Sequence, residues 1–395
     1  MLDLQLSDRV QQIKPSPTLA VTNRAAVLRA EGKDIIGLGA GEPDFDTPEH
    51  IKKAAINAIN AGFTKYTAVD GTPSLKQAII SKFKNDNNLE YEANQILVSC
   101  GGKQSFFNLS LALLNPGDEV VIPAPYWVSY PDMVKIAEGT PVIVETTMDN
   151  QFKMTAEQLD AAITPKTRLV VLNSPSNPSG KAYSLDELKA LGAVLNKYPD
   201  VLIATDDMYE LILWADFGFH NIVNACPELY ERTIVLNGVS KAFSMTGWRI
   251  GYAAGPAKLI GAMKKIQSQS TSNPTSISQV AAEAALNGGN ECVKPMVAAF
   301  RERHDYLVAA LNALPGVECI EGDGAFYAFP SFLEAMATMG ISDDIEFAEK
   351  MLIEAGVAMV PGSAFGSPGF MRLSFATSLE TLKDAIARLD KALSS

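Results

Sequence analysis

Short runs of apolar residues recur through the middle of the chain, and nearly every position in them is apolar. The clearest runs span residues 95–98, 119–122, 168–172, 201–204 and 233–236. Runs without a polar face are typical of strands buried on both sides, as in a mostly parallel sheet between two layers of helices. Helical spacing separates them, as at Leu75, Ala78, Ile79 and Phe83 after a helix start at Pro73. We therefore predict an α/β domain.

The last part of the chain has a different rhythm. Extended candidates lie at 325–329, 357–360 and 371–375, and helical candidates at 344–355 and 379–393. A length of 395 residues favours two domains over one core. Residues 1–46 are too short to fold alone and are expected to pack on the carboxy-terminal part. We predict an α/β large domain over 47–292 and a smaller α+β domain formed by both termini, 1–46 and 293–395.

Composition narrows the range of partners. The formal net charge is −12, and the chain has no basic run, so no nucleic acid and no anionic membrane surface is expected as a partner. No apolar run approaches the roughly 20 residues that span a bilayer. The cysteines are dispersed without a CxxC pair and the histidines are isolated, which favours a cytoplasmic protein without a metal site.

Residues 238–251 contain a lysine and an arginine among small residues. A lysine in a dry pocket is suited to forming a Schiff base with an aldehyde cofactor. A phosphate needs hydroxyls, backbone donors and a fixed cation, which Ser240 and Arg249 offer. The segment therefore fits a pyridoxal phosphate site with Lys241 as its reactive amine. A solvated Lys/Arg pair in a surface loop is the alternative.

Other polar residues follow predicted strands. Gly101 and Gly102 open an apolar helix, where backbone amides suit a phosphate, or they form only a tight turn. Asn177 lies in a Pro-rich segment where α/β enzymes bind ligands, or in a simple turn. Asp206 and Tyr209 follow the strand at 201–204. A carboxylate beside a pyridine nitrogen keeps that nitrogen protonated, but an acidic pair at this point also fits a helix cap.

Two further residues have both a functional and a structural interpretation. Trp127 follows another strand, where its indole would stack on a flat ring or pack in the core. Arg372 lies inside an apolar strand, where it would bind a carboxylate ligand or form an internal ion pair.

These motifs, in this order, resemble the fold type I, class I pyridoxal phosphate aminotransferases, and most closely the bacterial aspartate aminotransferases. The resemblance covers nearly the whole chain. It is carried by KPS–T from residue 14, AGEPDFDTP at 40–48, KYT at 65–67, GGKQ at 101–104, PYWVSYP at 125–131, NPSG at 177–180, SKAFSMTGWRIGY at 240–252 and RLSFATS at 372–378.

The resemblance implies roles for the cofactor-binding residues. Lys241 would form the Schiff base and then move the proton, Asp206 would pair with the pyridine nitrogen, and Trp127 would stack on the ring. Tyr209 and Asn177 would bind the phenolic oxygen. The phosphate would be held by Gly101, Gly102, Lys103, Ser240 and Arg249. Tyr66 would reach the phosphate of a neighbouring subunit, which implies a homodimer with shared active sites.

The resemblance also implies a substrate site. Arg372 would bind the substrate α-carboxylate beside Gly41, Asn177 and Trp127. Lys103, helped by Ser16 and Thr18, would bind a second carboxylate. Lys14 matches a position linked to prephenate in some relatives. Gly238 departs from the family, because many relatives have a phosphate-binding serine there.

The expected reaction is reversible amino transfer between L-aspartate and 2-oxoglutarate, giving oxaloacetate and L-glutamate. Prephenate or aromatic substrates on the same scaffold, or β-elimination, are the alternatives within this class. A cofactor-sensing transcription regulator would need a DNA-binding module, and the acidic chain argues against it.

Overall fold

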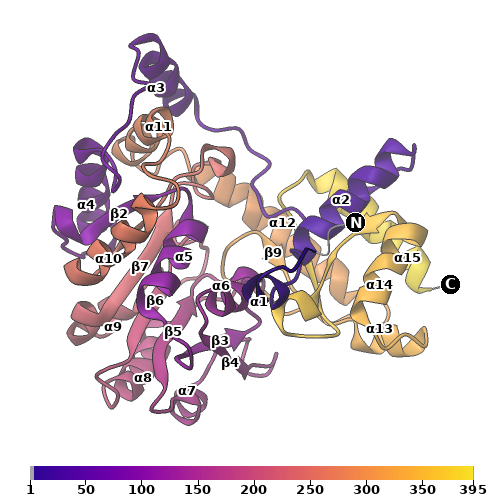
Figure 1. Cartoon of the computed structure of the whole chain (residues 1–395). Coiled ribbons are helices and arrows are strands. Elements are labelled where there is room, and N and C mark those ends of the chain that lie inside the picture. Colours follow the sequence, from indigo (N-terminus) through magenta and orange to yellow (C-terminus); the bar gives the residue numbers. More distant parts are fainter. Residues whose placement is uncertain (1–3, 395) are drawn as a thin grey trace.

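The computed structural model describes residues 4–394, which form two lobes joined by a long helix (Figure 1). The larger lobe is built on a seven-stranded sheet. In spatial order its strands are β2 (Ile96–Ser99), β8 (Gly251–Ala254), β7 (Thr233–Gly238), β6 (Leu202–Asp206), β5 (Thr167–Asn173), β3 (Glu119–Ala124) and β4 (Thr140–Glu145). The pairs from β7 to β4 are parallel, and β8 runs antiparallel to both of its neighbours.

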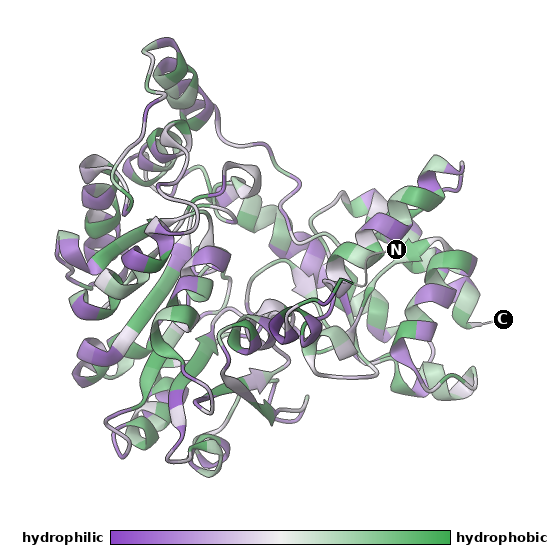
Figure 2. Cartoon of the chain, viewed as in Figure 1, coloured by the Kyte–Doolittle hydropathy of each residue, from purple (hydrophilic) through white to green (hydrophobic). Residues whose placement is uncertain are grey.

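Helices cover both faces of this sheet. The helices of the larger lobe are α3 (Glu49–Asn60), which packs on α11, and α4 (Pro73–Asn87), α5 (Gly102–Leu113), α6 (Ser129–Ile136), α7 (Ala156–Ala162), α8 (Leu185–Leu195), α9 (Ile222–Ala225), α10 (Ala257–Ser268) and α11 (Ser276–Asn287). Short turns of other helix types lie at Ala93–Gln95, Pro227–Arg232, Thr246–Trp248, Met351–Ala355 and Gly362–Phe365. The strands are mostly hydrophobic along their middle and carry polar residues at their ends, whereas the surrounding helices carry mixed faces (Figure 2).

Successive side chains along the strands point to opposite faces of the sheet and so belong to two separate hydrophobic clusters. In β5, Val170 and Leu172 join one cluster, while Leu169 and Val171 join the other. Both side-chain sets are 0–1% exposed, because successive strand residues point to opposite faces and both faces are covered. The predicted strand runs therefore do form buried strands of a mostly parallel sheet.

The smaller lobe combines both ends of the chain. It contains α2 (Pro17–Ala30), α12 (Lys294–Asn312), α13 (Leu333–Thr338), α14 (Asp344–Lys350) and α15 (Leu379–Leu393), with strands β9 (Tyr327–Ala328), β11 (Val360–Pro361) and β12 (Met371–Ser374). Strand β1 (Ile36–Gly37) pairs in parallel with β10 (Val357–Ala358), so the amino-terminal segment packs on the carboxy-terminal part, as expected. The short α1 (Asp8–Gln11) instead contacts α6 of the larger lobe, where Arg9 pairs with Glu138 at 2.9 Å.

Some elements differ from the prediction. Strands β4 and β8 were not predicted, because β4 is a half-exposed edge strand and β8 consists largely of small residues. The predicted helix over 344–355 is α14 only to Lys350, and a wider helical turn continues over Met351–Ala355. The boundaries of the domains at 46/47 and 292/293 stay a prediction. Among residues 4–394, no helix has the length and apolar character needed to span a membrane.

Candidate active site

A cavity of about 300 Å³ lies at the carboxyl ends of the parallel strands and is lined by residues of both lobes. Asn173 and Asp206 reach it from the ends of β5 and β6, which is where open α/β sheets bind ligands. Most of the predicted site residues line this cavity: Ser16, Thr18, Gly41, Gly102, Lys103, Trp127, Asn177, Asp206, Tyr209, Ser240, Lys241, Arg249 and Arg372. Segments far apart in the sequence thus converge on one site.

Three predicted residues do not line the cavity. Gly101 lies just outside it, as the residue that precedes α5. Tyr66 is 93% exposed, so within this one chain it contacts no ligand site. Lys14 is exposed and lies near Asp132 of α6, where its charge opposes the rise that burial causes in the pKa of that carboxyl.

The start of α5 forms an anion-binding end of the cavity. The helix has no side-chain cap, so its first amides face outward from the helix end. Gly101 has a φ of +90°, and a Cβ there would overlap the guanidinium of Arg249. Arg249 donates to the carbonyl oxygens of Thr246 at 2.8 Å and Cys100 at 3.2 Å. Helix amides, a guanidinium and the nearby Ser240 together suit a phosphate.

Lys241 lies in the loop that follows β7, with its amine inside the cavity. Its Nζ donates to the carbonyl oxygen of Gly41 at 2.5 Å. Burial, followed by the positive charges of Arg372 and Arg249, lowers the pKa of Lys241 to about 8, against the opposing charge of Glu42. A lower pKa makes the neutral, nucleophilic amine more available. The alternative of a solvated Lys/Arg pair is therefore wrong for Lys241, whereas Arg249 is exposed at the edge of the cavity.

Asp206 and Asp207 point to different sides of the sheet end. The hydroxyl of Tyr130 donates to Asp206 Oδ2 at 2.5 Å, and the N–H of Met208 donates to Oδ1 at 3.3 Å. Burial raises the pKa of Asp206, and the Tyr130 hydrogen bond and Lys241 oppose that rise. No helix begins here, since the next one in the chain is α9 at residue 222, so the helix-cap alternative is wrong.

Arg372, on β12, is buried, and no carboxylate among residues 4–394 pairs with it. It donates to Asn177 Oδ1 at 3.0 Å and to the carbonyl oxygen of Gly39 at 2.7 Å, and its Nε has no hydrogen-bond partner. Its guanidinium lies 4.5 Å from the ring centre of Tyr327 and 5.1 Å from that of Phe365. Both bonded oxygens are neutral, so the internal ion pair is wrong, and the cation is free to bind an anionic ligand.

The other wall of the cavity carries a second cation and hydroxyl groups. Lys103 Nζ lies 5.2 Å from the ring of Trp127. Burial, and secondarily Arg249, lower the pKa of Lys103. Thr18 Oγ1 is buried without a hydrogen-bond partner, whereas Ser16 accepts from the N–H of Leu19 at the start of α2.

Sequence reasoning missed Asn173 and Tyr327, which line the cavity, and Tyr130, which contacts the site through Asp206. Asn173 accepts from the N–H of Asn177 at 2.9 Å, and the hydroxyls of Tyr209 and Tyr327 lie 2.9 Å apart. Tyr130 was inside a recognised motif but had no assigned role. The strand-end rule that found Asp206 also applies to Asn173, which ends β5. No local signal marks Tyr327, because its partner is 118 residues away.

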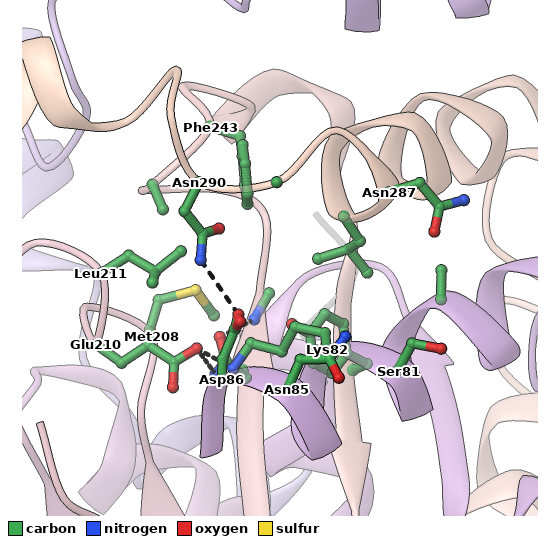
Figure 3. Close-up of a pocket in the computed structure, with 17 residues that line it drawn as sticks. Ser81, Lys82, Asn85, Asp86, Met208, Glu210, Leu211, Phe243, Asn287 and Asn290 are labelled. Carbon is green, nitrogen blue, oxygen red and sulfur yellow. Dashed lines mark hydrogen bonds and ion pairs between the residues drawn. The ribbon is translucent and has the colours of Figure 1, made fainter. Parts of the chain in front are cut away.

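A second cavity of about 250 Å³ shares the lining residue Met208 with the first. Figure 3 shows Lys82 from α4 paired with Glu210 at its floor. Glu210 also accepts from Asn237 at 3.0 Å. Glu210 therefore joins the turn after β6 to α4 through Lys82 and to the end of β7 through Asn237, which stabilises the segments that carry Asp206 and Lys241. In the described part of the chain, no group of three or more His, Cys, Asp or Glu side chains is placed to hold a metal.

Comparisons with known proteins agree with this geometry. Residues 33–389 match the family model of "Aminotransferase class I and II". An aspartate/prephenate aminotransferase of Nitrosomonas europaea is 64% identical, covering 99% of this chain and 100% of that protein. An aspartate/prephenate aminotransferase of Cereibacter sphaeroides is 55% identical over 97% of each chain.

Solved structures are similarly close. The aspartate aminotransferase of Rhizobium meliloti has a TM-score of 0.95 and 50% identity, with 99% of each chain covered. That of Thermus thermophilus, solved with maleate, has a TM-score of 0.93 and 42% identity, covering 98% of this chain and 100% of that one. The predicted fold type I architecture and the predicted resemblance are thereby confirmed. The chain belongs to the class I and II aminotransferases and is a pyridoxal phosphate-dependent enzyme.

Proposed function

We propose that this protein transfers the amino group of L-aspartate to 2-oxoglutarate, giving oxaloacetate and L-glutamate. The observation that carries the proposal is the presence of two cations, Arg372 and Lys103, in one cavity with a lysine of lowered pKa. The hydrogen bonds of Arg372 go only to neutral oxygens. Two cations in one cavity suit a substrate with two carboxylates.

The cavity fits pyridoxal phosphate by the chemistry of its donors. The cofactor supplies an aldehyde for covalent attachment and a ring that accepts electrons. The phosphate would lie on the amides from Gly101 to Lys103, with Ser240 and Arg249. At the other end, Asp206 would hold a proton on the ring nitrogen, and Trp127 would stack on the ring.

Asn177 and Tyr209 would both donate to the phenolic oxygen of the cofactor. Because Arg372 has only donors, the oxygen of the Asn177 amide must face it, and the amide NH₂ is then directed elsewhere. Lys241, once released from the cofactor, would take the proton from the substrate Cα. Its pKa of about 8 is close to what a general base needs near neutral pH.

Substrate orientation follows from the two cations. Arg372 would bind the α-carboxylate through two parallel N–H bonds, beside Gly41 and Asn177, and so fix the reacting Cα. Lys103 would bind the side-chain carboxylate, with hydroxyls from Ser16 and Thr18. In support, the Thermus thermophilus relative was solved with maleate, which is a dicarboxylate.

A second candidate function is transamination of prephenate, which is also a dicarboxylate. Two relatives with 64% and 55% identity are named aspartate/prephenate aminotransferases. Lys14, on the segment that leads to Ser16 at the cavity, would contribute to this activity. The test compares Lys14→Ala with the parent on prephenate and oxaloacetate. If Lys14→Ala loses activity only with prephenate, Lys14 has the proposed role. If its activity relative to the parent is the same with prephenate and with oxaloacetate, that role is excluded.

We further propose a cytoplasmic homodimer with shared active sites. The support is an apolar surface on and after α3, where Ile56 and Ile59 are each 53% exposed, Phe63 is 40% exposed and Tyr66 is 93% exposed. Large exposed side chains gathered on one element mark interaction sites. Sedimentation velocity should give a dimer, and a monomer that is fully active would exclude shared sites.

The dicarboxylate assignment is tested with Lys103→Leu and a matched control, Lys258→Leu, on the exposed surface of α10. Loss of one charged hydrogen bond should reduce kcat/KM for aspartate by about 10- to 100-fold. Activity with alanine or phenylalanine should change little, and Lys258→Leu should match the parent on all substrates. An equal loss on aspartate and alanine would remove Lys103 from the substrate site.

A further inference from the structure

Tyr327 lies where the substrate-binding and cofactor-binding sides of the cavity meet. Its hydroxyl oxygen is 2.9 Å from that of Tyr209, and its ring faces the guanidinium of Arg372 at 4.5 Å. A Cβ at Gly41 would lie only 3.2 Å from the same hydroxyl. Tyr327 thus contacts a residue that would bind the cofactor and a residue that would bind the substrate.

The sheet of the smaller lobe explains this position. Tyr327 on β9 pairs with Ser374 on β12, and Arg372 is two residues before Ser374. Side chains two residues apart share a face of the sheet, so Arg372 and Tyr327 are diagonal neighbours. Tyr209 comes from the larger lobe, in the turn after β6. The hydroxyl contact therefore joins the two lobes inside the cavity.

The direction of this hydrogen bond decides what Tyr209 can do. Each phenol has one proton, and burial raises the pKa of both Tyr209 and Tyr327, so both remain neutral. If Tyr209 donates to Tyr327, its proton is used and only lone pairs remain for the cofactor. If Tyr327 donates, the Tyr209 proton is free, and accepting a bond makes Tyr209 a better donor.

We propose that Tyr327 is a positioning residue, which donates its proton to the Tyr209 hydroxyl and so directs the Tyr209 proton to the phenolic oxygen of the cofactor. This inference rests on the proposed function, in which Tyr209 binds that oxygen. A donor at the phenolic oxygen stabilises its deprotonated form. Tyr327 thereby lowers the pH at which the bound cofactor changes colour.

The experiment is an absorbance titration of the holoenzyme and of Tyr327→Phe, which removes the hydroxyl and retains the ring on Arg372. We expect the pH midpoint of the colour change to rise by about 0.5 to 1, since one neutral hydrogen bond contributes about 1 kcal/mol and 1.36 kcal/mol corresponds to one pH unit. Tyr209→Phe should raise the midpoint at least as much. The midpoint of the double variant, Tyr209→Phe with Tyr327→Phe, should equal that of Tyr209→Phe alone.

Controls separate this role from a general structural one. Tyr183→Phe removes another buried hydroxyl, 2.9 Å from the N–H of Met154, and should leave the midpoint unchanged. Tyr327→Leu also removes the ring from Arg372 and should raise the KM for aspartate more than Tyr327→Phe does. If Tyr327→Phe does not fold, 3-fluorotyrosine at position 327, a stronger donor, should lower the midpoint.

The outcomes are distinct. A lower midpoint in Tyr327→Phe would show that Tyr209 donates to Tyr327. An unchanged midpoint in Tyr327→Phe, or a double variant whose shift is the sum of the two single shifts, would show that the contact between the two hydroxyls does not act on the cofactor. Each of these overturns the inference while leaving the aminotransferase intact. A parent protein that neither binds pyridoxal phosphate nor changes colour with pH would instead overturn the proposed function, and the inference with it.

Discussion

Replacing Arg372 with lysine tests whether the geometry of this cation, and not only its charge, orients the substrate. The guanidinium is held by Asn177 at 3.0 Å and by Gly39 at 2.7 Å, and it lies between two aromatic rings. A lysine retains a positive charge but presents a single nitrogen, so it cannot keep these contacts and also bind both oxygens of a carboxylate.

The magnitude follows from the lost contacts. One charged hydrogen bond to the substrate contributes about 1.5 to 3 kcal/mol, and 1.4 kcal/mol corresponds to a factor of ten. We therefore expect kcat/KM of Arg372→Lys for aspartate to fall by about 10- to 150-fold. Because the misplaced carboxylate also misplaces Cα, kcat should fall as well as KM rise.

The assay is steady-state kinetics over a range of aspartate and 2-oxoglutarate concentrations, with cofactor content measured by absorbance. Arg303→Lys is the matched control, since Arg303 is mostly buried, pairs with Asp44 at 2.8 Å and does not line the cavity. It should retain kcat/KM within about twofold. A change of less than threefold in Arg372→Lys, with cofactor fully bound, would refute the bidentate role of Arg372.

Two further changes test the phosphate end and a buried acid. Gly101→Ala, at φ +90° and against Arg249, should weaken pyridoxal phosphate binding at least tenfold, as measured by equilibrium dialysis, and unchanged affinity would contradict this. Burial and Glu210 raise the pKa of Asp207 from 3.8 to about 8, so below pH 8 the folded protein keeps this proton, and the contribution of Asp207 to stability should fall as pH rises from 4 to 8. The free energy of unfolding of Asp207→Asn, measured with urea, should rise relative to that of the parent by up to about 1.4 kcal/mol per pH unit across that window. If the unfolding free energies of the variant and the parent change in parallel with pH, the pKa shift of Asp207 is excluded.

Much of the site could be predicted because its residues follow buried strands. Asp206 and Asn177 were found in this way, since parallel strands bring their carboxyl ends to one edge. The sequence left the local alternatives open, and the structure decides them through burial and partners: Lys241 is inside the cavity, and Arg372 bonds only to neutral oxygens.

What could not be predicted depends on distant contacts. Tyr327 meets Tyr209 only because the smaller lobe packs over the sheet, and its own strand is two residues long. The different directions of Asp206 and Asp207 depend on where β6 ends and on Thr205 and Asn221, which bind Asp207. The role of Tyr66 stays a prediction, because it requires a second subunit.

The central claim is that Lys241 holds pyridoxal phosphate in the cavity, where the cofactor accepts an amino group from aspartate. It is tested most directly by the absorbance of the purified yellow protein before and after aspartate is added without an oxo acid. We predict that the visible band disappears as one equivalent of oxaloacetate is released per site, and that 2-oxoglutarate restores the band. A protein without the band, or with a band that aspartate leaves unchanged, would contradict the account.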